Sequence, residues 1–396
     1  MRCAGCASLF KIDLGVEGLR IGLVSAQADP LAVVDVGEQH RYVAELSRAL
    51  TREGHEVHVY TRRDGEPGRR TVRDGVVVEY GPSGEVAEFT GWLRDRWRRG
   101  WLPEVVHSQG WLSGLATVPA AAERGIPVAH TYHSLGTVRR RWYGRAEPTS
   151  RERVRSEKAL GASVDRVVAL FHGEVADLAR IGLPRTRIAV VAPGVDTDVF
   201  SPKGDAVPAD PARVLTIGVP EPGSGFDELI KLLRWVPDAE LVIAGGPAPD
   251  DVETDPRIDR LRRLAGSLDL ADRIRFLGAV PAAELPRWYR SAHVYVSASA
   301  TGTFGLPAVE AMACGLPVVA YGSGGVSESV VHRVTGLLVQ PHDLRGFALA
   351  LRGLLRNDLD RLAYADAGVD RAQSRYDWRR VIIDIVRVYE DVRRRS

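Results

Sequence analysis

The stretch that most constrains the fold is residues 297–320, which read SASATGTFGLPAVEAMACGLPVVA. A β-rich run over residues 293–299 enters a Gly-rich turn that ends in Phe-Gly-Leu-Pro at residues 304–307. The small residues over 308–314 favour a helix, and a proline is tolerated in its first turn, where the missing N–H would be unpaired in any case. Residues 318–320 begin another strand. The stretch therefore predicts a strand–turn–helix–strand unit.

This turn is also a predicted ligand site. The first amides of a helix have no partner inside the helix, and the positive end of the helix dipole attracts anions. Glu310 stands one turn into the helix, where its carboxylate can accept hydrogen bonds from a hydroxylated ligand. We expect a phosphate at the helix start with a sugar or ribose beside it. The alternative is a βα unit of any α/β protein, punctuated by glycine and proline.

Residues 304–320 resemble the donor-site signature of family 4 glycosyltransferases, which are retaining enzymes with the GT-B fold. The resemblance implies an α/β architecture in which two Rossmann-like, doubly wound domains face a cleft. It implies that Glu310 holds the ribose of a nucleotide-sugar donor and that the amides of residues 304–306 hold its diphosphate. The donor-site residues that it assigns at this turn are Thr303, Phe304, Gly305, Leu306 and Glu310.

The rest of the chain alternates strand and helix patterns. Apolar runs typical of buried strands lie at residues 19–25, 55–61, 76–80, 104–107, 127–131, 165–170 and 187–191. A second series lies at residues 214–218, 240–246, 274–278, 294–299, 318–321 and 336–339. Prolines and a glycine between the two series predict a linker. We expect an extension over 1–18, an acceptor domain over 19–200, a linker over 201–212, a nucleotide-sugar domain over 213–375 and a helix over 376–396 that crosses back to the first domain.

The first strand is followed by a turn over residues 35–42, and apolar residues spaced near 3.6 continue it as a helix over 43–50. Family members carry two or three glycines in this turn, near the donor diphosphate, whereas only Gly37 remains here. The resemblance assigns Gly37 and Gly218 to the donor site. A carboxylate on Glu38 would repel a phosphate unless it pointed away.

Residues 130–135, HTYHSL, resemble an acceptor-side motif of the mycothiol-pathway and sucrose-phosphate-synthase-like branch of the family. In that branch the second histidine, here His133, lies near the reacting centre and hydrogen-bonds the donor sugar. A neutral imidazole can do so at pH 7 without the cost of a buried charge. The resemblance thus makes His133 and Glu310 catalytic residues and puts His133 and Ser134 on the acceptor side. The alternative is a structural histidine at a strand end.

Arg153 matches an arginine that binds the acceptor phosphate in the mycothiol branch. Arg151 and Arg155 lie beside it, so a solvated helix face is the interpretation we favour for residues 151–155. The branch also has a tyrosine where this chain has Gly110, and an acceptor-binding lysine that has no counterpart here. The sequence therefore argues against an inositol-phosphate acceptor.

Three donor-side positions depart from the family pattern. Relatives carry an arginine and a lysine, which neutralise the donor diphosphate, at the positions of Val219 and Ser224. A further glutamate stands at the position of Gly302. Enzymes of this kind use no metal, so these cations do what magnesium does elsewhere; removing one such stabilising group costs about 2.7–4 kcal/mol of activation free energy.

Composition sets the remaining limits. The chain has 396 residues, of which 45% are hydrophobic and 26% charged, and a net charge of +2, which indicates no nucleic-acid partner. Three cysteines, Cys3, Cys6 and Cys314, imply no disulfide framework and fit a cytoplasmic protein. No apolar run reaches the roughly 18 residues of a membrane helix. The Arg/Trp-rich residues 92–101 favour a packed surface helix over a membrane contact.

The function that these features predict is transfer of a sugar from a UDP-, GDP- or dTDP-sugar to a small-molecule or glycoconjugate hydroxyl, with retention and without a metal cofactor. The alternative is a protein that keeps this fold as a binding or partner subunit after losing its donor-site cations. Binding of nucleotides separates the two.

Overall fold

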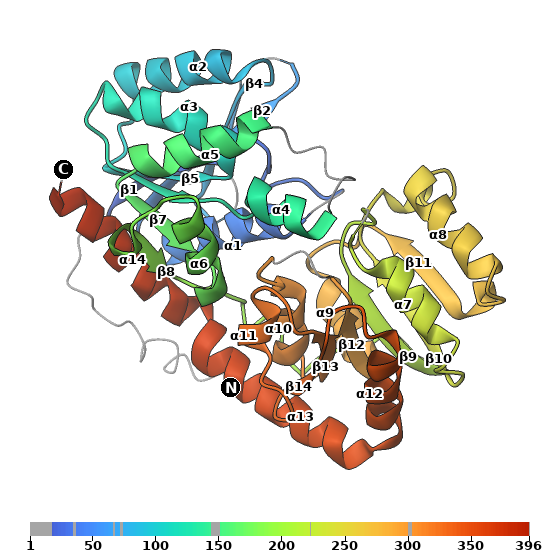
Figure 1. Ribbon diagram of the computed structural model, residues 1–396. Coiled ribbons are helices and arrows are strands. Elements are labelled where there is room, and N and C mark those ends of the chain that lie inside the picture. Colours follow the sequence, from blue (N-terminus) through green and yellow to red (C-terminus); the bar gives the residue numbers. More distant parts are fainter. Residues whose placement is uncertain are drawn as a thin grey trace, which may run out of the picture.

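The computed structural model describes residues 18–34, 37–65, 68–71, 74–143, 151–221, 223–299 and 303–395, without the side chains of 142–143. It has two lobes, each built on one sheet, and Figure 1 draws the first in blue to green and the second in yellow-green to red-orange. The expectations at Gly302, Cys3 and Cys6 lie outside the described residues.

The first sheet has the strand order β3-β4-β2-β1-β5-β6-β7-β8. Its strands are β1 (Arg20–Val24), β2 (Glu56–Arg63), β3 (Gly68–Thr71), β4 (Val77–Pro82), β5 (Val105–Gln109), β6 (Val128–Thr131), β7 (Arg166–Ala169) and β8 (Ile188–Val190). All pairings are parallel except that of β3 with β4. The central strands are buried on both faces, as their apolar sequences predict.

The second sheet has the order β11-β10-β9-β12-β13-β14 and is parallel throughout. Its strands are β9 (Ala212–Ile217), β10 (Ala239–Ala244), β11 (Ile274–Gly278), β12 (Val294–Ser297), β13 (Val318–Tyr321) and β14 (Gly336–Val339). The order turns back at β9 and β12, which are adjacent in the sheet. Ligands of such sheets bind beyond the carboxyl ends of the strands at this switch point.

Helices cover both sheets. In the first lobe they are α1 (Glu38–Arg52), α2 (Val86–Arg99), α3 (Trp111–Ala122), α4 (Gly136–Tyr143), α5 (Arg151–Ser163) and α6 (His172–Arg180). In the second lobe they are α7 (Phe226–Leu233), α8 (Pro256–Gly266), α9 (Leu285–Ser291), α10 (Leu306–Ala313), α11 (Val326–Ser329), α12 (Leu344–Arg356) and α13 (Asp358–Arg371).

The last helix, α14 (Trp378–Arg395), runs from the second lobe along the first (Figure 1). It packs on α1, β5 and β6. Ile382, Ile385 and Tyr389 are almost fully buried, and the Tyr389 hydroxyl lies 2.8 Å from Nδ1 of His107 in β5. A backbone bridge joins Val195 to Asp377 just before the helix begins. The chain therefore passes between the lobes twice at one place.

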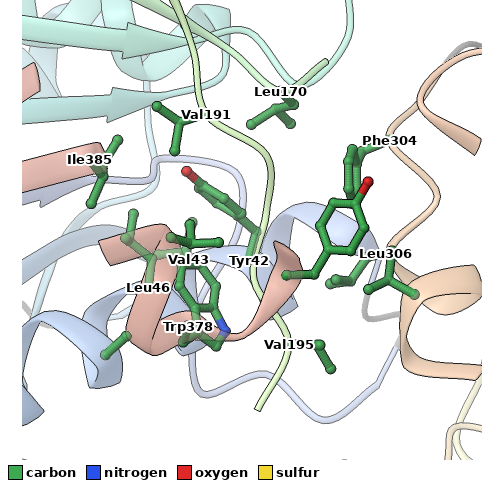
Figure 2. Packing of buried hydrophobic residues seen from close by; sticks show 14 of the residues in the cluster. Tyr42, Val43, Leu46, Leu170, Val191, Val195, Phe304, Leu306, Trp378 and Ile385 are labelled. Atoms are coloured by element: carbon green, nitrogen blue, oxygen red, sulfur yellow. The ribbon is translucent and has the colours of Figure 1, made fainter. Parts of the chain in front are cut away.

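One hydrophobic cluster extends across both lobes at this crossing. Figure 2 shows Tyr42, Val43 and Leu46 of α1 beside Trp378 and Ile385 of α14, with Phe304 and Leu306 of the second lobe facing them. This packing fixes the start of α1 in the first lobe close to the start of α10 in the second.

The tryptophans of residues 92–101 lie against the first lobe. Trp97 is 1% exposed, Trp92 stacks on Phe89, and Trp101 stacks on His58 with ring centroids 3.9 Å apart. Among the described residues, no helix is long and apolar enough to cross a membrane.

Candidate active site

The two lobes enclose a cleft of about 850 Å³. Its walls come from the first turn of α1 and the loop after β6 on one side, and from the loops after β9 and β10 and the start of α10 on the other. The sequence-predicted site residues that line it are Gly37, His133, Ser134, Gly218, Thr303, Phe304, Gly305, Leu306 and Glu310. Arg153 lies behind this lining and contacts Ser134.

The helix α10 begins at Leu306, two residues earlier than expected, so that Pro307 falls in its first turn. Gly305 caps it with φ of 80°, and a Cβ there would lie 2.2 Å from Cγ2 of Val326. Only glycine adopts this conformation at little cost and leaves room for that contact. Small side chains such as Ala308 and Ala311 let the whole helix be buried. The glycine cap and the buried small residues together fix the start of α10 at the edge of the cleft.

A carboxylate of the chain itself lies at this helix start. The Gly305 N–H donates to Oε2 of Glu38 at 3.2 Å, and Thr303 Oγ1 lies 3.5 Å from its Oε1. Burial raises the pKa of Glu38, against the opposing effects of Arg41 and the Gly305 N–H. A Glu38 carboxylate would repel a phosphate unless it pointed away, and here it points into the predicted anion position.

Glu310 also has a partner from the first lobe. Arg41 Nη1 donates to Oε1 at 2.7 Å and to Oε2 at 2.6 Å, and the Tyr289 hydroxyl donates to Oε2 at 2.7 Å. The Glu310 side chain is only 4% exposed. Sequence reasoning missed both partners. Arg41 stands one turn after Glu38 and could have been noticed as a cation in the first βα turn, whereas Tyr289 gives no signal in the sequence.

His133 lies in the opposite wall with φ of 59°, in the left-handed region. Its Nε2 is 2.7 Å from Oε1 of Gln109, and its ring packs edge-on against Tyr42. Burial, and to a smaller extent His40, lower the pKa of His133 to about 3. The imidazole is therefore neutral at pH 7 and presents an uncharged polar group to the cleft.

The favoured interpretation of residues 151–155 as a solvated face is wrong for Arg153. Its Nε donates to Oε1 of Glu157 at 2.8 Å, and its Nη2 donates to the Ser134 carbonyl at 3.0 Å. Glu157 also accepts the Gly136 N–H, which ties the start of α4 to α5. Arg151 and Arg155 are exposed. Arg153 turns inward because a buried carboxylate one helical turn away neutralises it.

Val219 and Ser224 both line the cleft, as their alignment with the family cations predicts. Ser224 Oγ is buried and has no hydrogen-bond partner among the described residues. Among the described residues that line the cleft, the arginines stand at other positions: Arg41, Arg48, Arg139 and Arg257. Of these, Arg41 pairs with Glu310, Arg48 with Glu45, and Arg257 with Asp255.

Two parallel-sheet, Rossmann-like domains that meet at such a cleft, with a last helix crossing back, define the GT-B class of glycosyltransferases. Comparison with protein families agrees. Residues 39–199 match the model of Glycosyltransferase Family 4, and residues 200–371 match that of Glycosyl transferases group 1.

Similar proteins cover nearly the whole chain. The D-inositol 3-phosphate glycosyltransferase of Xylanimonas cellulosilytica is 34% identical over 96% of this chain and 99% of its own. The sucrose-phosphate synthase of Thermosynechococcus elongatus superposes with a TM-score of 0.87 at 27% identity, over 96% of this chain and all of that one. Anabaena HepE in complex with UDP-glucose shares the fold, with a TM-score of 0.77 at 17% identity over 94% of this chain and all of that one.

The chain belongs to glycosyltransferase family 4, and it is a glycosyltransferase with the GT-B fold. The family and the fold that its sequence predicts are thereby confirmed. The domain bounds and the roles of individual site residues stay predictions.

Proposed function

We propose that this glycosyltransferase moves a sugar from a nucleotide-sugar donor to a hydroxyl of a small-molecule or glycoconjugate acceptor, with retention of anomeric configuration. The observation that carries the proposal is the start of α10, where the Gly305 N–H faces the cleft and Glu310 stands one turn further on. An anion-binding helix start beside a hydroxyl-binding carboxylate suits a nucleoside diphosphate. A UDP-glucose complex of a protein with this fold supports the same ligand class.

In the proposed reaction the acceptor hydroxyl attacks from the face that the leaving group vacates. The leaving diphosphate oxygen takes the hydroxyl proton, so no side chain is needed as a general base. The amides of residues 304–306 hold the diphosphate, Glu310 holds the ribose, and the neutral His133 contacts the transferred sugar. Preorganised donors of this kind stabilise the charge that develops on the leaving group. The proposal assigns no metal or other cofactor.

The acceptor binds in the first domain, near His133 and Ser134. We propose that it differs from inositol 3-phosphate, although relatives carry that name. Arg153, which would bind the acceptor phosphate, is already paired with Glu157. At Gly110 φ is 81°, and a Cβ would lie 3.2 Å from Nε2 of Gln39, so a tyrosine there would be strained. An acceptor without a phosphate fits these two positions better.

The donor sugar is the second specificity question. The family glutamate that contacts hydroxyls of the donor sugar is replaced by Gly302, which has no side chain. We therefore propose a donor that lacks or replaces one of those hydroxyls, such as a deoxy or amino sugar. A donor panel in which glucose is preferred over every deoxy and amino sugar would contradict this.

The test is a transfer assay with UDP-, GDP-, ADP- and dTDP-sugars against a panel of polyol and sugar acceptors, with the anomeric configuration of the product read by NMR. The proposal predicts a product that keeps the donor configuration. An inverted product would refute the retaining mechanism. Absence of both turnover and nucleotide binding would instead favour a binding or partner subunit.

A further inference from the structure

We infer that the first turn of α1 occludes the donor site of the second domain, with Glu38 in place of a donor phosphate and Arg41 in place of the ribose hydroxyls. The inference rests on the proposed function, because it takes the start of α10 as the nucleotide site. It adds a self-inhibitory contact between the domains that a nucleotide must displace.

The Glu38 carboxylate accepts the hydrogen bond from the Gly305 N–H, which a donor phosphate would need. Backbone N–H groups at a helix start are the standard partners of a phosphate oxygen, and Glu38 already accepts the one from Gly305. The Thr303 hydroxyl lies beside the other carboxylate oxygen. A diphosphate and Glu38 would both be anions competing for these donors, and two anions cannot share the site without a large electrostatic cost.

Arg41 occupies Glu310 in the same way. Its Nη1 spans both carboxylate oxygens, and the Tyr289 hydroxyl takes a further acceptor position on Oε2. Ribose hydroxyls would have to compete with a charge-assisted pair whose arginine side chain is only 13% exposed. Charge-assisted hydrogen bonds are about twice as strong as neutral ones, so a neutral sugar does not displace Arg41 unaided.

Both contacts come from one turn of α1. Glu38 and Arg41 are three residues apart and belong to the same helical turn, while Tyr42, Val43 and Leu46 anchor α1 in the core of the first domain. The turn is therefore rigidly attached to its domain. A nucleotide therefore has to displace two separate contacts, the Glu38 side chain from Gly305 and the Arg41 side chain from Glu310.

A second carboxylate between the domains provides a control. Glu328 of α11 accepts the N–H groups of His172 and Gly173 at 2.9 and 2.7 Å, at the start of α6. It thus joins the domains by the same chemistry as Glu38, but it does not line the described cleft. Removing its charge loosens the domains without clearing the donor site.

The experiment is calorimetric titration of the full chain with inorganic pyrophosphate and with UDP, GDP and dTDP. The variants are Glu38→Gln, Arg41→Met and the control Glu328→Gln. Glu38→Gln keeps the size and hydrogen bonding of the side chain but removes the competing charge. We therefore expect it to lower the Kd of pyrophosphate, and of the nucleotide that binds most tightly, by about tenfold or more. Glu328→Gln should change both by less than threefold. Arg41→Met should raise the ratio of nucleotide affinity to pyrophosphate affinity, because it frees Glu310 alone.

The outcomes separate this inference from the proposed function. Wild-type binding that Glu38→Gln leaves unchanged refutes the occlusion while the nucleotide site stands. An equal gain in Glu328→Gln also refutes it, because domain opening alone would then explain the effect. If neither the wild type nor any variant binds a nucleotide or pyrophosphate, both the occlusion and the proposed function are wrong.

Discussion

The guanidinium of Arg41 lies 2.7 and 2.6 Å from the two carboxylate oxygens of Glu310, although the residues are 269 positions apart and belong to different domains. Breaking a buried ion pair by removing one partner costs about 3–5 kcal/mol, because the other charge is left uncompensated. We predict that Arg41→Met lowers the free energy of unfolding by that amount in urea titrations. Arg48→Met is the control. Arg48, on the same helix, pairs with Glu45 and Asp74 but its side chain is 36% exposed, so its loss should cost about 0–1 kcal/mol. An equal loss of unfolding free energy in the two variants would contradict the assignment of Arg41 and Glu310 as a buried, stabilising ion pair.

Glu174 predicts a pH dependence of stability. This carboxyl is buried at the start of α6, and burial raises its pKa to about 7, although the Leu170 N–H opposes the shift. A raised pKa means that the folded state keeps a proton that the unfolded state loses near pH 4.5. The stabilisation is therefore complete below pH 4.5 and is lost as the pH rises through about 7.

Glu174→Gln removes this dependence, because the amide stays neutral and its oxygen can still accept the Leu170 N–H. We expect the variant to match the wild type closely at pH 4.5 and to be more stable by about 3 kcal/mol at pH 8.5. Unfolding curves at both pH values measure this. If the difference in unfolding free energy between the wild type and the variant is the same at both pH values, Glu174 does not titrate in this range.

Substitution of His133 tests its proposed contact with the transferred sugar. Because its φ is 59°, asparagine is the substitution that best tolerates the backbone. We predict that His133→Asn lowers kcat about 10²- to 10³-fold, the cost of one positioned hydrogen-bonding group, and leaves the nucleotide Kd unchanged. Since its pKa is lowered to about 3, His133 should contribute no ionisation to the pH profile of kcat above pH 5. A nucleotide Kd that changes as much as kcat would assign His133 to donor binding or folding.

The missing cations predict a gain of affinity. Val219 and Ser224 line the cleft, and the family resemblance predicts an arginine and a lysine at these positions. A donor diphosphate is costly to bury without compensating charge. The double variant Val219→Arg with Ser224→Lys should therefore make the binding free energy of a nucleotide sugar more favourable by about 1.5–3 kcal/mol for each good ion pair formed. Val219→Gln with Ser224→Gln is the uncharged control. Tight wild-type binding with no gain in the charged variant would mean that another cation, such as Arg139 in the same cleft, already serves the diphosphate.

The parallel strands were predictable because their apolar runs are buried on both faces and punctuated by glycine and proline. The strand β3 was missed for the converse reason: its residues, GRRT, are all exposed, and it joins the sheet edge antiparallel to β4. No apolar pattern marks such a strand. The last helix was expected over 376–396 and α14 begins at Trp378; its strongly amphipathic sequence made it predictable.

The candidate site was predictable in part. A local motif located Gly305 and Glu310, because the strand, turn and helix that position them are contiguous in sequence. The direction of Glu38 and the pairing of Arg41 depend on how the two domains meet, which local sequence does not contain. Arg153 was misjudged because its neighbours are exposed arginines, while the carboxylate that turns it inward, Glu157, is buried by tertiary packing.

The central claim is that the start of α10 binds the nucleotide of a sugar donor, with Glu310 on the ribose. Calorimetry of the wild type and Glu310→Gln against UDP, GDP, ADP and dTDP tests it most directly. We predict measurable wild-type binding of at least one nucleotide, weakened in the variant by about 1.5–3 kcal/mol, the scale of a charge-assisted hydrogen bond. An unchanged Kd in Glu310→Gln, or no binding of any nucleotide at millimolar concentration, would contradict the account.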